Sequence, residues 1–274
     1  MTETIFDKFN MKNKAAIITG GAGLLGRQFS KTLSEAGAGV VVADLFGDKA
    51  EIVAQNLREN GYEAIAIEFD VTNPKSVKNM VDKTVQQYGR LDAIVNSAAM
   101  DPKFDAEHAG QHNNSFEDYP VDAFRSALDV NLTGMFLCSQ AAVVPMLKQN
   151  SGSIINICST YGLVGPDQRL YDREGQPKQF KPVFYSVTKA GVLGFTRYLA
   201  TYYAGTQIRT NALTPGGVFN DHDSLFLERY SARTVLGRMA NQDEMNGAVL
   251  FLASDASSYM TGANLVVDGG WTAW

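Results

Sequence analysis

A tyrosine and a lysine four positions apart, Tyr185 and Lys189, are the residue pair whose types and spacing point most directly to chemistry. On a helix, residues i and i+4 share one face, so the phenol and the ammonium can reach the same cleft. A free phenol titrates at about pH 10, and bringing its pKa to about 7 takes roughly 4 kcal/mol of preference for the phenolate. One cation at about 4 Å supplies about that much at an effective dielectric near 20, but only about 1 kcal/mol in bulk water. The pair therefore predicts a partly dry site where Tyr185 exchanges a proton with an alcohol or a forming alkoxide.

The stretch from Ala15 to Arg27, AAIITGGAGLLGR, predicts a strand, a glycine turn and a helix. Glycines let the backbone turn sharply and approach a ligand, and the helix start offers free N–H groups to a pyrophosphate. Gly21-x-Gly23-x-x-Gly26 fits the dinucleotide pattern, and Asp44 follows at the end of the next apolar run. A carboxylate there accepts both adenosine ribose hydroxyls and repels a 2′-phosphate, so we expect NAD rather than NADP. Arg27 is interpreted as a surface residue of the first helical turn.

Apolar runs alternate with amphipathic segments along the whole chain of 274 residues, which favours βαβ units around a parallel sheet. We predict one doubly wound α/β domain with a seven-stranded Rossmann sheet and helices on both faces. The expected strands span 15–18, 40–44, 64–69, 92–95, 154–159, 208–213 and 264–267, and the expected helices span 24–37, 48–60, 74–89, 121–149, 184–204 and 245–253.

The motifs together resemble the single-domain branch of the short-chain dehydrogenase/reductase family, from about Lys12 to the C-terminus. The matching pieces are the glycine loop, Asp70-Val71, Asn96-Ser97-Ala98-Ala99 in place of the family's N-A-G, Asn131, Ser159, Tyr185, Lys189, Pro215-Gly216 and the ending Val266-Val267-Asp268-Gly269-Gly270. A weaker similarity, in Gly20–Gly26, the loop before Tyr185 and Pro215–Phe219, links the chain to oxidoreductases of bacterial flagellin-modification and nonulosonate sugar pathways.

The family resemblance implies a role for each catalytic candidate. Tyr185 would be the acid/base and Ser159 would hydrogen-bond the reacting oxygen. Lys189 would hold the nicotinamide ribose and polarise Tyr185, and Asn131 would support a water relay behind Lys189. The implied cofactor contacts come from Gly20, Gly23, Leu25, Gly26, Asp44, Leu45, Asp70, Val71, Asn96, Ala98, Tyr185, Lys189, Pro215, Gly216 and Val218.

Two features depart from the family pattern. Thr19-Gly20-x-x-Gly23-x-x-Gly26 has the glycine spacing of the longer branch that handles nucleotide sugars, whereas the C-terminal half favours the single-domain branch. The gap between Ser159 and Tyr185 is about twice the family's usual length, and the segment from 96 to 131 also looks extended. We therefore expect one domain over 12–274, after a loosely held arm over 1–11, with substrate-lid insertions near 100–119, 160–182 and 218–236.

Composition narrows the partners and the compartment. A net charge of -5, with 45% hydrophobic and 19% charged residues, gives no reason to expect nucleic acid or a membrane surface as partner. No apolar run is expected to span a bilayer, no secretion signal is evident, and Cys138 and Cys158 look like buried reduced thiols, so we expect a cytoplasmic protein. We expect no metal site, since His108 and His112 have no evident third ligand.

The expected activity is NAD-dependent interconversion of a secondary alcohol and a ketone on a polar small molecule: a sugar, a sugar phosphate or a polyol. A 3-oxoacyl carrier-protein reductase is the alternative enzyme, and a non-catalytic NAD-binding regulator is the alternative of another class. His222 is a candidate substrate contact, while Arg169, Arg173, Lys178 and Lys181 are interpreted as solvated charges. We expect a homotetramer, with a dimer as second choice, in which Gly191 and Gly194 allow close helix packing and Trp271 and Trp274 lie at a subunit contact.

Overall fold

The computed structural model describes residues 4–101 and 114–274. Seven parallel strands form one sheet in the order β3-β2-β1-β4-β5-β6-β7. Successive strands are added on one side of β1 as far as β3 and on its other side from β4 onward, as in a doubly wound sheet. The strands are β1 Ala15–Thr19, β2 Gly39–Asp44, β3 Ala64–Glu68, β4 Ala93–Asn96, β5 Gly152–Ile157, β6 Ile208–Pro215 and β7 Asn264–Val267. The predicted fold class is confirmed, with strand ends shifted by up to two residues.

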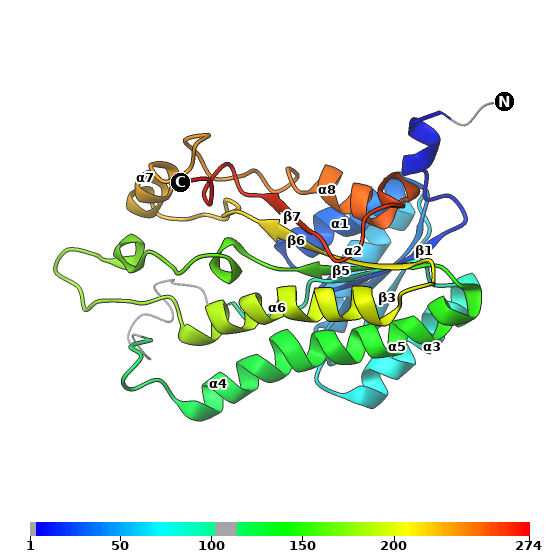
Figure 1. Ribbon diagram of the computed structural model, residues 1–274, viewed down its shortest axis with the longest axis horizontal. Helices are drawn as coiled ribbons and strands as arrows, with labels where there is room; N and C mark the ends of the chain where they lie inside the picture. Colours follow the sequence, from blue (N-terminus) through cyan, green and yellow to red (C-terminus); the bar gives the residue numbers. More distant parts are fainter. Residues whose placement is uncertain (1–3, 102–113) are drawn as a thin grey trace.

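Helices cover both faces of the sheet (Figure 1). Helices α1, α2 and α8 pack with β1 and β2 in one hydrophobic core, and α3, α5 and α6 pack in a second core on the other face. Their bounds are α1 Leu24–Glu35, α2 Gly47–Glu59, α3 Pro74–Tyr88, α4 Val121–Leu128, α5 Gly134–Gln149, α6 Val183–Tyr202, α7 Ser224–Ser231 and α8 Asn246–Ala253. Because strands β1, β2, β4 and β5 are buried along their whole length, their near-continuous apolar runs fit a sheet covered on both sides.

The helix expected over 121–149 contains one irregular turn. Between α4 and α5, residues Asp129–Thr133 form a π-helical turn, η2. The whole span Val121–Gln149 is long and apolar enough, by length and composition, to cross a membrane, so the expectation that no run reaches that length is wrong. It packs here against α3, α6 and the sheet and buries Cys138, Ala142 and Met146, as a core helix does.

The described part of the N-terminal segment forms one short helix before the first strand. Residues Phe6–Phe9 form a 3₁₀-helix, η1, which contacts η5 (Asp255–Ser257). The segment ends at Met11, which is fully buried and whose N–H donates to the carbonyl of Ala36 at 2.8 Å. The chain thus begins at the amino end of the sheet, whereas α7 and the C-terminus lie at the opposite end (Figure 1).

Candidate active site

The glycine loop between β1 and α1 forms a cradle that only small residues allow. A Cβ on Gly20, whose φ is +63°, would lie 2.9 Å from Ala98 Cα, and one on Gly26 would lie 2.1 Å from the carbonyl oxygen of Gly20. Gly23 caps α1 without a side-chain partner, so the first amides of the helix lie beside the loop. These features fit the pyrophosphate of a dinucleotide, which needs a close backbone approach and a helix start.

Asp44 is held in place at the end of β2. Its Oδ2 accepts from the Ala22 amide at 3.0 Å and its Oδ1 accepts from the Phe46 amide at 3.1 Å, so the carboxylate is tied to the glycine loop. Leu45 and Phe46, which follow it, are apolar and more than half exposed. The edge of the loop therefore presents one carboxylate flanked by apolar side chains.

Thr19 and Asn96 join the ends of neighbouring strands beneath this loop. The Thr19 hydroxyl accepts from the amides of Ser97 and Ala98 at 3.0 and 3.1 Å, which joins the ends of β1 and β4. Asn96 donates to Asn156 Oδ1 at 2.8 Å and to Ser139 Oγ at 3.0 Å, while its own buried Oδ1 has no protein partner. These hydrogen bonds hold the segment Asn96-Ser97-Ala98-Ala99 at the sheet edge.

The other expected cofactor residues follow strand ends at the same edge. Asp70 folds back on Thr72 through Oδ1 at 2.8 and 2.7 Å, and Val71 packs closely against Gly134. At the end of β6, the Gly216 amide bonds the Val267 carbonyl, and Val218 pairs with Ala240 in a short bridge. Leu25, in the first turn of α1, is half-buried against the α1 side of the core. All the expected cofactor residues therefore line the carboxyl edge or adjoin it.

Asn131 lies in the π-helical turn and not in a regular helix. Its Oδ1 accepts from the Met100 amide at 2.7 Å, and its Nδ2 donates to the Met100 carbonyl and to Thr188 Oγ1 at 3.2 Å each. Single π-turns inside helices frequently mark functional positions. The turn aims a buried amide at α6, one residue before Lys189, and at the segment after β4.

Tyr185, Ser159 and Lys189 lie close together at the carboxyl edge of the sheet. Ser159 follows β5 by two residues, not at its last position as expected, and starts the 3₁₀-turn η3 (Thr160–Gly162). Burial raises the pKa of Tyr185 well above its usual value, and a hydrogen bond from Ser159 opposes that rise. The Lys189 Nζ lies 5.7 Å from the Tyr185 ring centroid and donates to the Ile157 carbonyl at 2.9 Å, and burial lowers its pKa. The phenol and the ammonium share one dry site.

Lys181 is a residue whose position the sequence interpretation missed. It was expected to be solvated, yet its side chain is only 9% exposed, pairs with Asp101 and places Nζ 4.2 Å from the Tyr185 ring centroid. Arg169 and Arg173 are likewise paired, with Asp167 and Asp223. No spacing rule links Lys181 or Asp101 to Tyr185, because both lie in irregular segments.

Two of the segments predicted to be substrate lids, 160–182 and 218–236, pack on each other, with the ring centroids of Tyr171 and Phe226 5.8 Å apart. Helix α7, which the sequence interpretation did not include, stacks Phe226 between His222 and Tyr230, and Tyr230 stacks on Trp271 with ring centroids 4.3 Å apart. His222 is half-buried, and burial is the main cause that lowers its pKa. Trp271 is thus buried within its own chain, so its expected place at a subunit contact is wrong. We call these four rings, His222, Phe226, Tyr230 and Trp271, the aromatic column.

Within residues 4–101 and 114–274, no three His, Cys, Asp or Glu side chains gather as a metal site would require. His108 and His112 lie outside the residues that the structure describes.

The two glycines expected at a subunit contact differ in their surroundings. A Cβ added to Gly191 would lie 3.0 Å from the Leu132 side chain of the same chain, whereas one added to Gly194 would meet open space. Cys138 and Cys158 are both buried and unbridged.

The residues present fit a nicotinamide dinucleotide. The glycine cradle and the amides of α1 would hold the pyrophosphate, Asp44 the adenosine ribose, and Lys189 the nicotinamide ribose. The bound cofactor supplies hydride chemistry. This chain's own contribution would be the proton: Ser159 would orient a substrate oxygen, and Tyr185 would give or take its proton beside the Lys189 ammonium. The arrangement suits interconversion of an alcohol and a carbonyl.

Comparisons with known proteins agree with this geometry. The family description "Enoyl-(Acyl carrier protein) reductase" matches residues 21–272. The cis-4-hydroxycyclohexanecarboxylate dehydrogenase of Sinomonas cyclohexanicum is 35% identical over 95% of this chain and 97% of its own, and a 3-oxoacyl-[acyl-carrier-protein] reductase of Staphylococcus aureus is 33% identical over 94% and 97%. A gluconate 5-dehydrogenase from Burkholderia cenocepacia, solved with NADP and tartrate, superposes with a TM-score of 0.86 at 29% identity and covers 99% of this chain and 100% of its own.

The relatives extend over nearly the full length of the chain. In this chain, the glycine cradle and the cluster of Ser159, Tyr185 and Lys189 both lie at the carboxyl edge of the sheet. The chain belongs to the short-chain dehydrogenase/reductase family, as a single-domain oxidoreductase of the secondary-alcohol dehydrogenase type that binds a nicotinamide dinucleotide.

Proposed function

We propose that this protein uses NAD to interconvert a secondary alcohol and a ketone on a small polar substrate, with Tyr185 as the acid/base. The carrying observation is the convergence of Tyr185, Ser159 and Lys189 at the sheet edge where the glycine cradle ends. In the proposed roles, Ser159 holds the reacting oxygen and Asn131 braces the segment behind Lys189.

Asp44 supports the choice of NAD. Its carboxylate is fixed by two amides, and the following Leu45 offers no cation to a 2′-phosphate. A phosphate about 4 Å away would meet a penalty of roughly 1 to 4 kcal/mol. The Burkholderia neighbour binds NADP, so the ratio of kcat/KM with NAD to that with NADP is the deciding measurement.

The substrate proposal is a sugar, a sugar phosphate or a polyol. The described parts of the rim carry charged and hydrogen-bonding side chains, among them His222, Arg173 and Asp223, which suit a hydroxylated molecule more than a fatty chain. The relatives named for hydroxycyclohexanecarboxylate and gluconate add small hydroxy acids to the candidates. The weaker similarity of Gly20–Gly26, the loop before Tyr185 and Pro215–Phe219 to oxidoreductases of flagellin-modification and nonulosonate pathways adds an amino sugar to the candidates.

A panel of polyols, sugar phosphates, gluconate and both 4-hydroxycyclohexanecarboxylate isomers, with NAD or NADP and NADH or NADPH absorbance as readout, tests the proposal. We expect turnover with NAD on at least one polar alcohol of this panel. Loss of that turnover in Tyr185→Phe, with NADH binding retained, separates an enzyme from an NAD-binding regulator. Unchanged turnover in that variant would contradict the assigned role.

The alternative activity is reduction of a 3-oxoacyl thioester, which the Staphylococcus relative favours. Acetoacetyl-CoA with NADPH belongs in the same panel as a surrogate for the carrier-protein substrate. The fixed carboxylate of Asp44 and the net charge of -5, which does not favour docking of an acidic carrier protein, weigh against it. A kcat/KM for acetoacetyl-CoA above those of all alcohols would replace the main proposal.

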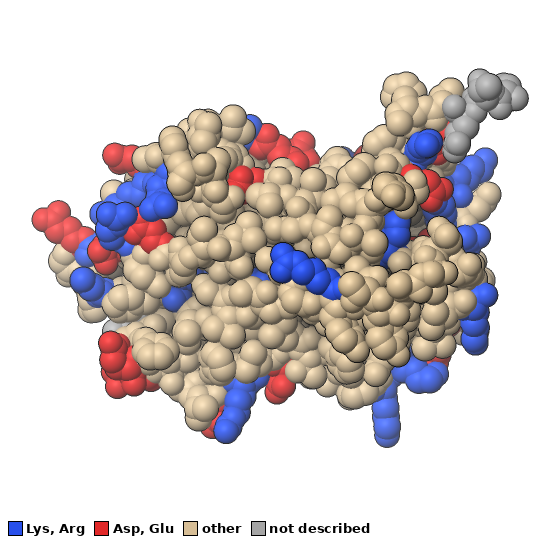
Figure 2. Space-filling view, in the orientation of Figure 1, with Lys and Arg blue, Asp and Glu red and all other residues tan. Residues whose placement is uncertain are grey.

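The assembly we propose is a homotetramer, with a dimer as second choice, in the cytoplasm. Helices α5 and α6 expose Phe136, Val144, Leu147, Tyr198 and Tyr202, and Figure 2 shows few charged side chains over these helices. Apolar surface of this kind favours a protein partner. Sedimentation at micromolar concentration distinguishes the tetramer from the dimer, and a monomer would contradict both.

A further inference from the structure

Lys181 places a second ammonium beside Tyr185, on the ring face. Its Nζ lies 4.2 Å from the ring centroid, against 5.7 Å for the Nζ of Lys189. Lys181 comes from the insertion between η4 (Gln168–Tyr171) and α6, whereas Lys189 comes from α6 itself. The longer loop between Ser159 and Tyr185 therefore brings a cation that the helix does not supply.

The two states of Tyr185 interact differently with this cation. A neutral phenol ring attracts a cation through its quadrupole, but a phenolate adds a full negative charge to that attraction. Lys181 thus stabilises the ionised state more than the neutral one. Asp101, which pairs with Lys181, has the opposite effect, and its charge raises the pKa of Tyr185.

Few other charges face Tyr185 from the described elements packed against it. Burial raises the pKa of Tyr161 and of Tyr171, which keeps both neutral, and His222, near Lys181 and Asp101, is held neutral by its lowered pKa. The titratable, charged or hydrogen-bonding groups involved are Lys189 from α6, Cys158, Ser159 and Tyr161 after β5, Tyr171 from η4, Lys181 from the insertion, Asp101 after β4 and His222 before α7.

We propose that Lys181 and Asp101 set the proton affinity of Tyr185 in opposite directions, so that both are positioning residues for the acid/base. This inference rests on the proposed function only in assigning that role to Tyr185. The ion pair is then a balance between a cation that favours the phenolate and a carboxylate that favours the phenol. Removing either partner shifts the titration of Tyr185 one way or the other.

The test is a titration of Tyr185 in the full-length, NAD-saturated protein. Isotope labelling of the tyrosine Cζ gives a resonance that reports ionisation, and Tyr185→Phe assigns it. In Lys181→Met we expect the midpoint to rise by about one pH unit, and in Asp101→Asn to fall by about half a unit to one unit. Lys181→Arg keeps the charge and the ring contact, so it should titrate as the wild type does.

Lys14→Met is the matched control, because Lys14 pairs with Asp255 at the opposite end of the sheet and should leave the midpoint unchanged. A purely structural ion pair would give equal midpoints, or shifts of one sign, in Lys181→Met and Asp101→Asn. Either result, or no titration in any of the proteins, overturns the inference. If Lys181→Met fails to fold by circular dichroism, Asp101→Asn decides alone, and a wild-type midpoint overturns the proposal.

The pH profile of kcat/KM for an alcohol from the panel gives a second readout. The rising limb should move with the resonance, toward alkaline pH in Lys181→Met and toward acid pH in Asp101→Asn. Opposite shifts of the resonance without turnover on any panel compound would contradict the proposed function and leave the charge balance standing. Turnover whose rising limb is the same in all variants would support the function and overturn the inference.

Discussion

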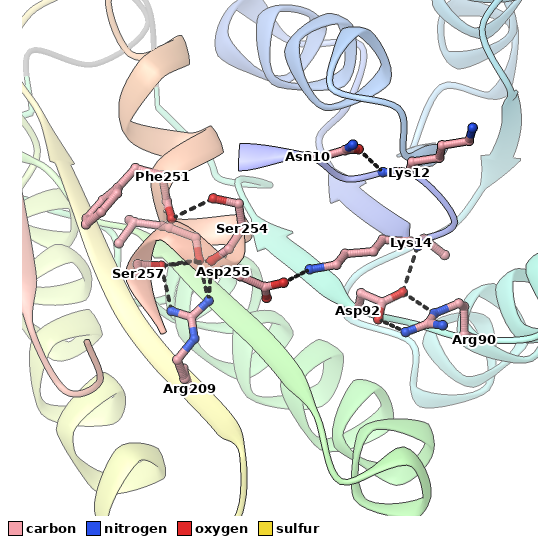
Figure 3. A network of polar contacts seen from close by, with 12 residues as sticks. Asn10, Lys12, Lys14, Arg90, Asp92, Arg209, Phe251, Ser254, Asp255 and Ser257 are labelled. Atoms are coloured by element: carbon pink, nitrogen blue, oxygen red, sulfur yellow. Dashed lines mark hydrogen bonds and ion pairs between the residues drawn. The ribbon is translucent and has the colours of Figure 1, made fainter. Parts of the chain in front are cut away.

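The two ends of the sheet both bury charged groups, but they treat those groups differently. At the amino end, the Asp92 carboxylate accepts from the Ala15 amide and from Nε and Nη2 of Arg90. Nearby, Arg209 donates to the carbonyls of Leu252, Ser254 and Met260. Figure 3 shows its guanidinium beside Ser254 and Ser257. At the carboxyl end, by contrast, the buried ammonium of Lys189 donates to one carbonyl, that of Ile157, and burial raises the pKa of Tyr185 and lowers that of Lys189.

The difference separates stability from function. Partnered charges at the amino end lower the free energy of the folded chain, since leaving a buried polar group without its partner costs about 1 to 3 kcal/mol. At the carboxyl end, buried ionisable groups have few hydrogen-bond partners, so they remain able to change protonation state or to bind a ligand. The comparison predicts that substitutions at the two ends change different measurements.

The largest effect is expected from Tyr185→Phe. Loss of the phenol oxygen removes the proton donor and acceptor, so kcat should fall about 10³-fold. The midpoint of thermal unfolding should stay near that of the wild type, because the ring remains packed. Steady-state kinetics and a melting curve check the two halves. A large drop in melting temperature would break the separation between the two ends.

Asp92→Ala should show the reverse pattern. The substitution strands the Ala15 amide and the Arg90 guanidinium, and we expect the free energy of unfolding to fall by about 2 kcal/mol. Chemical denaturation measures the loss, and kcat per folded molecule should not change. Asp92→Asn, which can still accept the amide hydrogen bond, is the control and should lose less.

Asp44→Asn tests the ligand side of the carboxyl end. The amide oxygen can still accept from one loop amide, but the negative charge is gone, so discrimination against a 2′-phosphate should weaken about tenfold. The ratio of kcat/KM for NAD and NADP measures this change. An unaltered ratio would show that another group selects the cofactor.

Asp167→Asn gives the smallest effect, and pH reveals it. Hydrogen bonds from Arg169 first, and then from Arg233, lower the pKa of Asp167 below its ordinary value. The ionised carboxylate therefore stabilises the fold above the ordinary Asp pKa, and that contribution is lost as the pH falls through the lowered one. The melting temperatures of wild type and variant should differ most near neutral pH, and the difference should shrink steadily as the pH falls below about 4, the ordinary pKa of an aspartate. A constant difference at all pH values would contradict the assignment.

Regular elements explain why so much of the fold was predictable. The apolar runs of β1, β2, β4 and β5 and the glycine turn have periodic or local signatures, and Tyr185 and Lys189 lie on one helix, where spacing dictates a shared face. The contact of Lys181 with the Tyr185 ring, the π-turn at Asn131 and the aromatic column depend on irregular segments packing together. No local pattern encodes such tertiary contacts, so the sequence interpretation left Lys181 in solvent and Trp271 at an interface.

The aromatic column has a practical consequence for handling the chain. Tyr230 stacks directly on Trp271, and Phe226 and His222 continue the stack. Trp271 lies three positions before the last residue, with the Arg233 guanidinium 5.0 Å from its ring centroid. The C-terminal residues thus belong to the same apolar cluster as Tyr185. An affinity tag placed ahead of η1 keeps clear of this cluster, whereas trimming the final residues would remove the ring on which the aromatic column stacks.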